Sequence, residues 1–191
     1  MSTRIVMRIA TSLAVVAVGA VALTACGGTS SSGGGGGSGS QAATVVPVKS
    51  NPISNTATTP GLEIASVLVE NNVNPDTGKD AADHLEIALK NTATKPLDGF
   101  EIYYLIADPT SKTKEGYYTK LKPSFTIAPG ATRIVHFDDT GATDHYPENK
   151  YSLYHASKNA MTIDVTASAA GFAPQMDSVK KDAGGAENPD E

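Results

Sequence analysis

Residues 100–108 read FEIYYLIAD, and this is the densest apolar run in the part of the chain that can fold. In an extended strand alternate side chains point to opposite faces, so the run has two faces to compare. One face carries Phe100, Ile102, Tyr104 and Ile106. The opposite face still carries Tyr103 and Leu105. Because both faces are partly apolar, the run predicts a strand in the middle of a sheet.

The segments around this run also have the lengths and alternation of β-strands. They are residues 62–70, 84–90, 117–121, 124–127, 132–137 and 161–168. Proline and glycine mark turns between them, as in Asn-Pro-Asp-Thr-Gly at 74–78 and Ala-Pro-Gly at 128–130. A short helix or turn is expected only at 151–159, and nothing supplies the crossover helices of a parallel sheet. We therefore predict an all-β fold, an antiparallel sandwich of about seven strands over residues 61–171.

A longer window around the central run resembles a known module. Residues 90–104 read KNTATKPLDGFEIYY, which is a strand end, a polar turn and an aromatic-apolar strand. This pattern is similar to immunoglobulin-like modules of bacterial surface lipoproteins, and the FxLYD-type domains are the nearest comparison. The chain lacks the literal Phe-x-Leu-Tyr-Asp string. The resemblance therefore implies an immunoglobulin-like sandwich in a lipoprotein, and it transfers no active-site residue.

The N-terminal segment has the organisation of a secretion signal. Two arginines precede an apolar run at residues 9–21, and Leu-Thr-Ala-Cys at 23–26, which holds the only cysteine, looks like a bacterial lipobox. The run is shorter than the ~20 residues that a membrane-spanning helix needs. We therefore expect residues 1–25 to be a lipoprotein signal peptide. Cys26 would carry a diacylglycerol anchor and hold the mature protein on the extracytoplasmic side of the cell membrane.

The segments on either side of the predicted sandwich have few apolar side chains to bury. Residues 27–40 read GGTSSSGGGGGSGS, and residues 41–60 are rich in threonine, asparagine, proline and valine. We expect residues 26–60 to be a flexible linker that is stiffer in its second half. Residues 172–191 are predicted to be a disordered acidic tail.

Charge restricts the classes of partner. All 20 acidic residues follow residue 62, and they outnumber the lysines and arginines there. A net acidic domain argues against binding to nucleic acid and against electrostatic docking of the whole domain on anionic lipid. The expected partners are the membrane, through the lipid on Cys26, and a protein of the cell envelope.

The familiar catalytic motifs of hydrolases are absent in usable contexts. The four histidines are His84, His136, His145 and His155, and histidines in such positions are more often structural or on the surface. We therefore expect a binding or structural module, not an enzyme, without a cofactor. A hydrolase with an unrecognised site is a less favoured possibility.

Two acidic loops are candidate cation sites. Residues 72–83 imitate the spacing of an EF-hand loop, but Thr77 occupies its glycine position, so a hairpin loop is expected there. Residues 138–148 contain four carboxylates and His145, and His155 follows. Such ligands could hold calcium or a transition metal. The alternative function is therefore a cation-binding or metal-delivery lipoprotein that uses loop 138–148, although no metal ligand is assigned.

Overall fold

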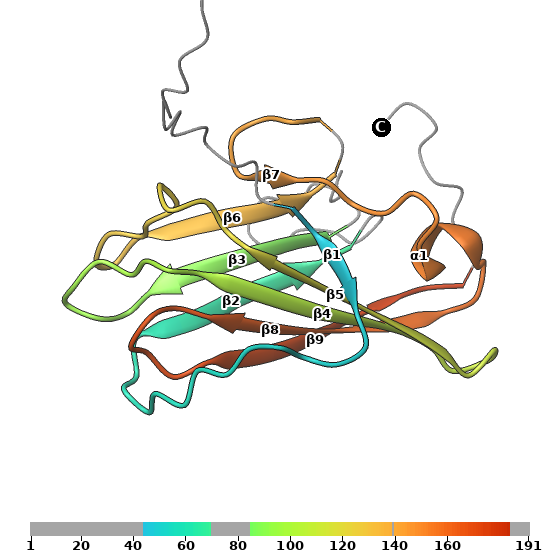
Figure 1. The fold of residues 1–191 in the computed structure, drawn as a ribbon, viewed down its shortest axis with the longest axis horizontal. Helices are drawn as coiled ribbons and strands as arrows, with labels where there is room; N and C mark the ends of the chain where they lie inside the picture. Colours follow the sequence, from blue (N-terminus) through green and yellow to red (C-terminus); the bar gives the residue numbers. More distant parts are fainter. Residues whose placement is uncertain (1–43, 70–84, 139, 184–191) are drawn as a thin grey trace, which may run out of the picture. The chain divides into compact units, whose positions relative to one another are not determined.

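The computed structural model describes residues 44–69, 85–138 and 140–183, which form two packed β-sheets (Figure 1). All of them belong to the unit of residues 39–191, and residues 1–38 lie wholly outside the described residues. The elements in chain order are β1 (Val46–Val48), β2 (Leu62–Leu68), β3 (Leu85–Asn91), β4 (Glu101–Asp108), β5 (Thr113–Lys120), β6 (Thr132–Phe137), β7 (His145–Tyr146), α1 (Leu153–Ala156), β8 (Met161–Ser168) and β9 (Gln175–Lys181).

The order of the strands confirms the prediction of an all-β sandwich. The first sheet has the order β1-β5-β4-β8-β9, and the second has the order β2-β3-β6-β7. Every pairing is antiparallel except that of β6 with the two-residue β7. The runs β2-β3-β6 and β4-β8-β9 correspond to strands A-B-E and C-F-G of the immunoglobulin fold. Strand β5 is added beside β4, as the extra strands of variable-type domains are.

Strand β4 lies in the middle of the first sheet, as its two apolar faces predicted. It pairs with β5 on one side and with β8 on the other. Its inner face is buried, and no part of the Ile102 surface is exposed. The Tyr104 ring meets Phe137 of the second sheet edge to face, with 5.0 Å between ring centroids. Aromatic pairs in this geometry add to the stabilisation that burial provides, so β4 is a main contact between the sheets.

The polar turn before β4 is organised by Asn91, which is fully buried at the end of β3. Its side-chain amide nitrogen donates to the carbonyl oxygens of Lys95 and Ile127, each at 2.8 Å, and its side-chain oxygen accepts from the Ala93 amide at 2.8 Å. A buried amide is tolerated only when its polar atoms are hydrogen-bonded. Asn91 thus joins this turn to the connection between β5 and β6.

That connection contains one predicted strand that the structure does not form. Residues 124–127 make only an isolated bridge, between Ile127 and Leu97, although Phe125 and Ile127 are buried. Pro123 and Pro129 flank the segment, and proline cannot donate a ladder hydrogen bond. The alternation of apolar residues at 124–127 therefore predicted burial correctly, but it did not predict strand pairing.

The predicted disordered tail is wrong for residues 172–183, because β9 lies within it. Strand β9 pairs with β8 along its whole length, from Gln175 opposite Ala167 to Lys181 opposite Met161. Phe172 and Val179 also pack against the core. An edge strand can be held by one backbone ladder and a few buried side chains, so low apolar content did not prevent folding. Residues 184–191 lie outside the described residues.

The predicted linker also ends earlier than expected. Strand β1 pairs with β5, and residues 49–60, which we call the strap, then lead to β2 in the other sheet (Figure 1). The side-chain amide of Asn55 donates to Ser168 Oγ and to the carbonyl oxygens of Ala169 and Phe172, at 2.8–3.0 Å. Tyr103, on the outer face of β4, is only 8% exposed. The segment from residue 44 to residue 60 is therefore part of the domain, whereas residues 26–43 lie outside the described residues.

The first prediction tests the inner face of β4. Ile102→Ala should lower the free energy of unfolding by about 2–5 kcal/mol, because a fully buried side chain loses both transfer energy and packing. Glu101→Ala, one residue away and half-buried, should cost about 1 kcal/mol through loss of its hydrogen bond from the Tyr118 hydroxyl. Urea titration of both variants measures the contrast, and a larger cost for Glu101→Ala would contradict the register of β4.

The second prediction tests the strap with a matched pair of asparagines. The side-chain oxygens of Asn51 and Asn55 each accept a hydrogen bond from the backbone amide two residues further along the chain, at 3.0 and 2.9 Å. Their side-chain nitrogens differ in the number of hydrogen bonds they donate. That of Asn51 donates only one, to Thr166 Oγ1 at 3.3 Å. Asn55→Ala should therefore lower stability by about 1–3 kcal/mol, and Asn51→Ala by clearly less. Equal effects in thermal or urea unfolding would show that the amide of Asn55 does not hold the strap.

Candidate functional site

Most of the candidate polar residues lie in the connection between β6 and β8, residues 138–160. This connection contains β7 and α1. Asp139 is outside the described residues, as are His84, the EF-hand-like segment 72–83 and Cys26. The structure therefore addresses three of the predicted histidines and the remaining acidic residues of loop 138–148.

His145 is oriented by a buried carboxylate. Its Nδ1 lies 2.5 Å from Oδ2 of Asp138, whose side chain is 4% exposed. The other carboxylate oxygen accepts from the backbone amide and the hydroxyl of Thr140, at 2.9 and 2.8 Å. The His145 ring stacks on His136 of β6, with 4.4 Å between centroids and 7° between planes. These contacts fix the start of the loop against the second sheet.

This cluster has three residue types of a catalytic triad but not its geometry. In a triad the nucleophile and the carboxylate occupy opposite ring nitrogens of the histidine. Here the Thr140 hydroxyl, at 2.9 Å, and the Asp138 carboxylate both lie at Nδ1 of His145. The hydroxyl also donates to Asp138. The arrangement therefore braces the loop and does not activate Thr140.

The other carboxylates of the loop face different basic partners. Asp144 binds the Arg133 guanidinium through both oxygens, at 2.6 and 2.7 Å, and Glu148 lies 2.9 Å from Nε2 of His155. Within the described ranges, no group of three or more histidine, cysteine or acidic side chains is placed to hold a metal ion. The loop that the sequence offered as a cation site thus separates its described ligands into three pairs.

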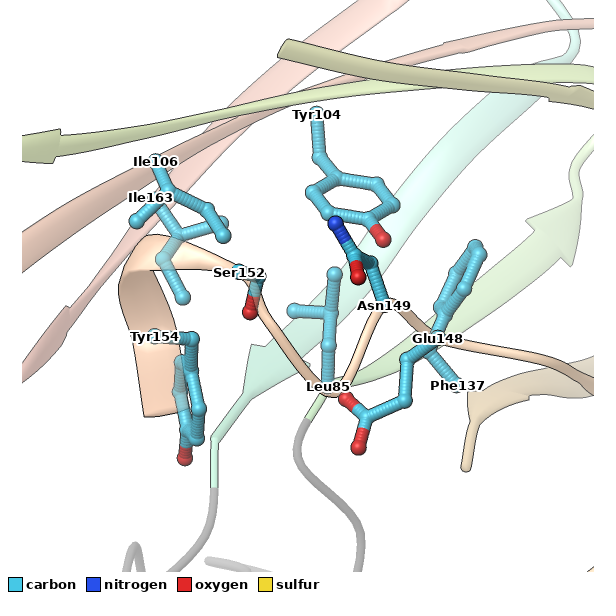
Figure 2. Close-up of a pocket in the computed structure, with 9 residues that line it drawn as sticks. All are labelled: Leu85, Tyr104, Ile106, Phe137, Glu148, Asn149, Ser152, Tyr154 and Ile163. Atoms are coloured by element: carbon cyan, nitrogen blue, oxygen red, sulfur yellow. The ribbon is translucent and has the colours of Figure 1, made fainter. Parts of the chain in front are cut away.

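A small cavity opens between this connection and the core (Figure 2). It is lined by Leu85, Tyr104, Ile106, Phe137, Glu148, Asn149, Ser152, Tyr154 and Ile163. Its volume is about 20 Å³. That is room for roughly one water molecule, whereas sites for small organic ligands are usually several hundred Å³. The cavity therefore does not define a site for a metabolite.

Beside the cavity, a tyrosine and carboxylate network joins β5 to the connection. Glu115 Oε2 accepts from the Tyr117 hydroxyl at 3.0 Å and from the Leu153 amide at 2.7 Å. Asn149 donates to the Tyr117 hydroxyl at 3.1 Å. Burial raises the pKa of Tyr117 to about 12. Burial, followed by the charge of Glu148, also raises the pKa of Tyr104 well above its usual value. Both phenol groups therefore stay neutral near pH 7 and remain able to hydrogen-bond.

Sequence reasoning missed this network, although β5 carried a signal. Glu115 shares its strand face with Tyr117 and Thr119, both of which are buried. A carboxylate that points inward by alternation needs a partner. What the sequence could not show is that the partners come from residues 149–153, which are distant along the chain.

Asp108 is a second residue that the sequence did not single out. It is buried at the end of β4, and its Oδ1 accepts the amides of Thr110 and Ser111 at 2.8 and 3.0 Å. Its Oδ2 accepts from Ser157 Oγ at 3.0 Å and from the Asn159 side chain at 2.8 Å. The Asn159 hydrogen bond is the main cause that lowers the pKa of this carboxyl well below its usual range. Asp108 thereby joins the β4–β5 turn to the segment before β8.

Comparison with known proteins adds no assignment to these clusters. No protein-family model matches the chain, and no curated protein matches it significantly in sequence. In the part of the chain that the structure describes, no helix is long and apolar enough to cross a membrane.

The third prediction concerns Asp108 and pH. A carboxyl whose pKa is lowered by folding stabilises the native state above its unfolded pKa, and this contribution is lost as the pH falls through the folded pKa. Asp108→Asn should therefore be less stable than the parent chain at pH 7, because one of its two acceptor oxygens becomes a donor. The difference should narrow as the pH falls below about 4.

The measurement is urea unfolding of both chains across acidic and neutral pH. Asp164→Asn, on an exposed position of β8, is the control for loss of one negative charge. A difference between Asp108→Asn and the parent that is constant with pH would show that ionisation of Asp108 contributes nothing to folding.

Proposed function

We propose that this chain is a membrane-anchored extracytoplasmic lipoprotein whose immunoglobulin-like domain serves as a binding or structural module at the cell envelope. The observation that carries the proposal is Cys26, the only cysteine, which follows Leu-Thr-Ala at the end of an apolar segment. A lone thiol at that place suits acylation and cannot form an internal disulfide. Two acyl chains would then anchor the protein stably.

The organisation of the domain supports this proposal. The first strand in the described part of the chain, β1, begins at Val46, so residues 27–43 would separate the domain from the lipid. That segment is mostly glycine, serine and other small residues, which suits a flexible tether. A tethered sandwich presents two sheet faces and two sets of loops to its surroundings.

A module function also agrees with how the described polar residues are used. The carboxylates of Asp108, Glu115, Asp138 and Asp144 each accept hydrogen bonds from other parts of the domain. The one cavity described above holds about one water molecule. Because these polar groups stabilise the fold, a partner would bind at the surface of the domain, and that partner would be a protein of the cell envelope.

The fourth prediction tests the anchor. Cys26→Ser should move the protein from the membrane fraction to the soluble extracytoplasmic fraction, or leave it as unprocessed precursor, because serine cannot form the thioether to the lipid. Ser38→Ala, a comparably small change in the glycine-serine tract, should leave the protein in the membrane fraction. Fractionation with immunoblotting, together with incorporation of labelled palmitate, measures both effects. Retention of a cleaved Cys26→Ser protein in membranes would exclude the lipobox.

A further inference from the structure

The outer face of the first sheet carries a row of side chains next to the β4–β5 turn. Strand registers place Lys114 opposite Ala107, Ala107 opposite Thr162, and Thr162 opposite Lys180. Because Ile106 points into the core, Ala107 and its row point outward. Lys112 lies in the adjacent turn, and Lys49 follows β1, whose last residue pairs with Gly116. We call Lys49, Lys112, Lys114 and Lys180 the lysine face.

These four lysines are exposed and have no acidic partner among the described residues. Other lysines are paired, as Lys90 is with Glu63 and Lys120 is with Glu101. The acidic residues on the same outer face are Glu101, which also accepts from the Tyr118 hydroxyl, and Asp164, and the exposed Asp182 follows just after β9. The lysine face is therefore locally positive, although the domain as a whole is rich in acidic residues.

We propose that the lysine face docks the domain on anionic phospholipid. Salt screens exposed charges beyond about 10 Å, so a surface responds to the nearest face and not to the net charge of the whole chain. Each lysine close to an anionic bilayer strengthens binding by about fivefold. A β-sheet face presents its lysines on a broad surface, which suits a bilayer better than a pocket would. The face also carries Met176, which is 79% exposed and opposite Thr166.

The tether proposed above is long enough for the lysine face to reach the membrane. The described chain begins at Thr44, just before Val46, which pairs with Tyr118 of β5, and Lys114 lies four residues further towards the opposite end of the same sheet. A flexible segment the length of residues 27–43 has an average span of roughly 20–25 Å. In cells the docking rests on the proposed anchor, because a short tether keeps a weakly binding surface at high effective concentration near the membrane.

The fifth prediction measures docking without the lipid anchor. Residues 27–191 contain every described contact of the sandwich, so this chain keeps the fold but lacks Cys26. In sedimentation with vesicles it should bind phosphatidylcholine–phosphatidylglycerol mixtures and not phosphatidylcholine alone. Lys114→Glu with Lys180→Glu should weaken binding to the mixed vesicles by at least about tenfold, and high salt should abolish it.

The matched control is Lys95→Glu with Lys122→Glu, which changes the net charge equally on exposed loops at the other end of the sandwich. This variant should bind nearly as well as the parent chain, and circular dichroism should show that both variants are folded. The proposal would be overturned if the chain bound both kinds of vesicle equally or bound neither. It would also be overturned if the two double variants lost binding to the same extent. None of these outcomes bears on acylation, which the Cys26→Ser fractionation tests separately.

Discussion

The fold depends on the burial of β4 on both of its faces. The second sheet covers the inner face, where Ile102 has no exposed surface. The outer face carries Tyr103, which is 8% exposed, and an isolated two-layer sandwich would leave this ring in water. Strand β1 and the strap complete the domain on that side, with Asn55 as their main polar attachment. The attachment on this side of the sheet is therefore made by a segment whose composition is that of a linker.

The central part of the sandwich was predictable because β4 is apolar on both faces and hydropathy alternates along β8, and these patterns report which faces are buried. The prediction failed at β1, the strap and β9, which are held mainly by backbone ladders and by amide contacts such as those of Asn55. The amide contacts of Asn55 join residues more than a hundred positions apart, and neither they nor the backbone ladders leave a periodic trace in the sequence. Residues 124–127 show the opposite failure. Their alternation predicted a strand, but between two prolines they are partly buried without forming one.

The candidate site shows a similar limit. A loop dense in carboxylates has the same sequence whether it gathers ligands around a cation or distributes them among basic partners. In the described part of this loop the carboxylates are distributed among basic partners, since Asp144 meets Arg133 and Asp138 meets His145. Glu115 could have been recognised by its inward position beside Tyr117 on β5, but its partner Leu153 becomes adjacent only after folding. Polar residues that brace loops and polar residues that bind ligands thus differ by geometry, not by composition.

The strap also determines how the domain responds to mechanical force. A pull on the chain ahead of residue 44 reaches β1 first, a strand of three residues paired with β5. The next point of resistance is Asn55, whose amide joins the strap to Ser168 and to the chain that follows β8. Release of the segment between them lengthens the chain by about 3.4 Å per residue while the ladders of β4 with β5 and β8 remain closed. The domain thus contains an extensible element in series with its core, which absorbs displacement before the sandwich itself bears the load.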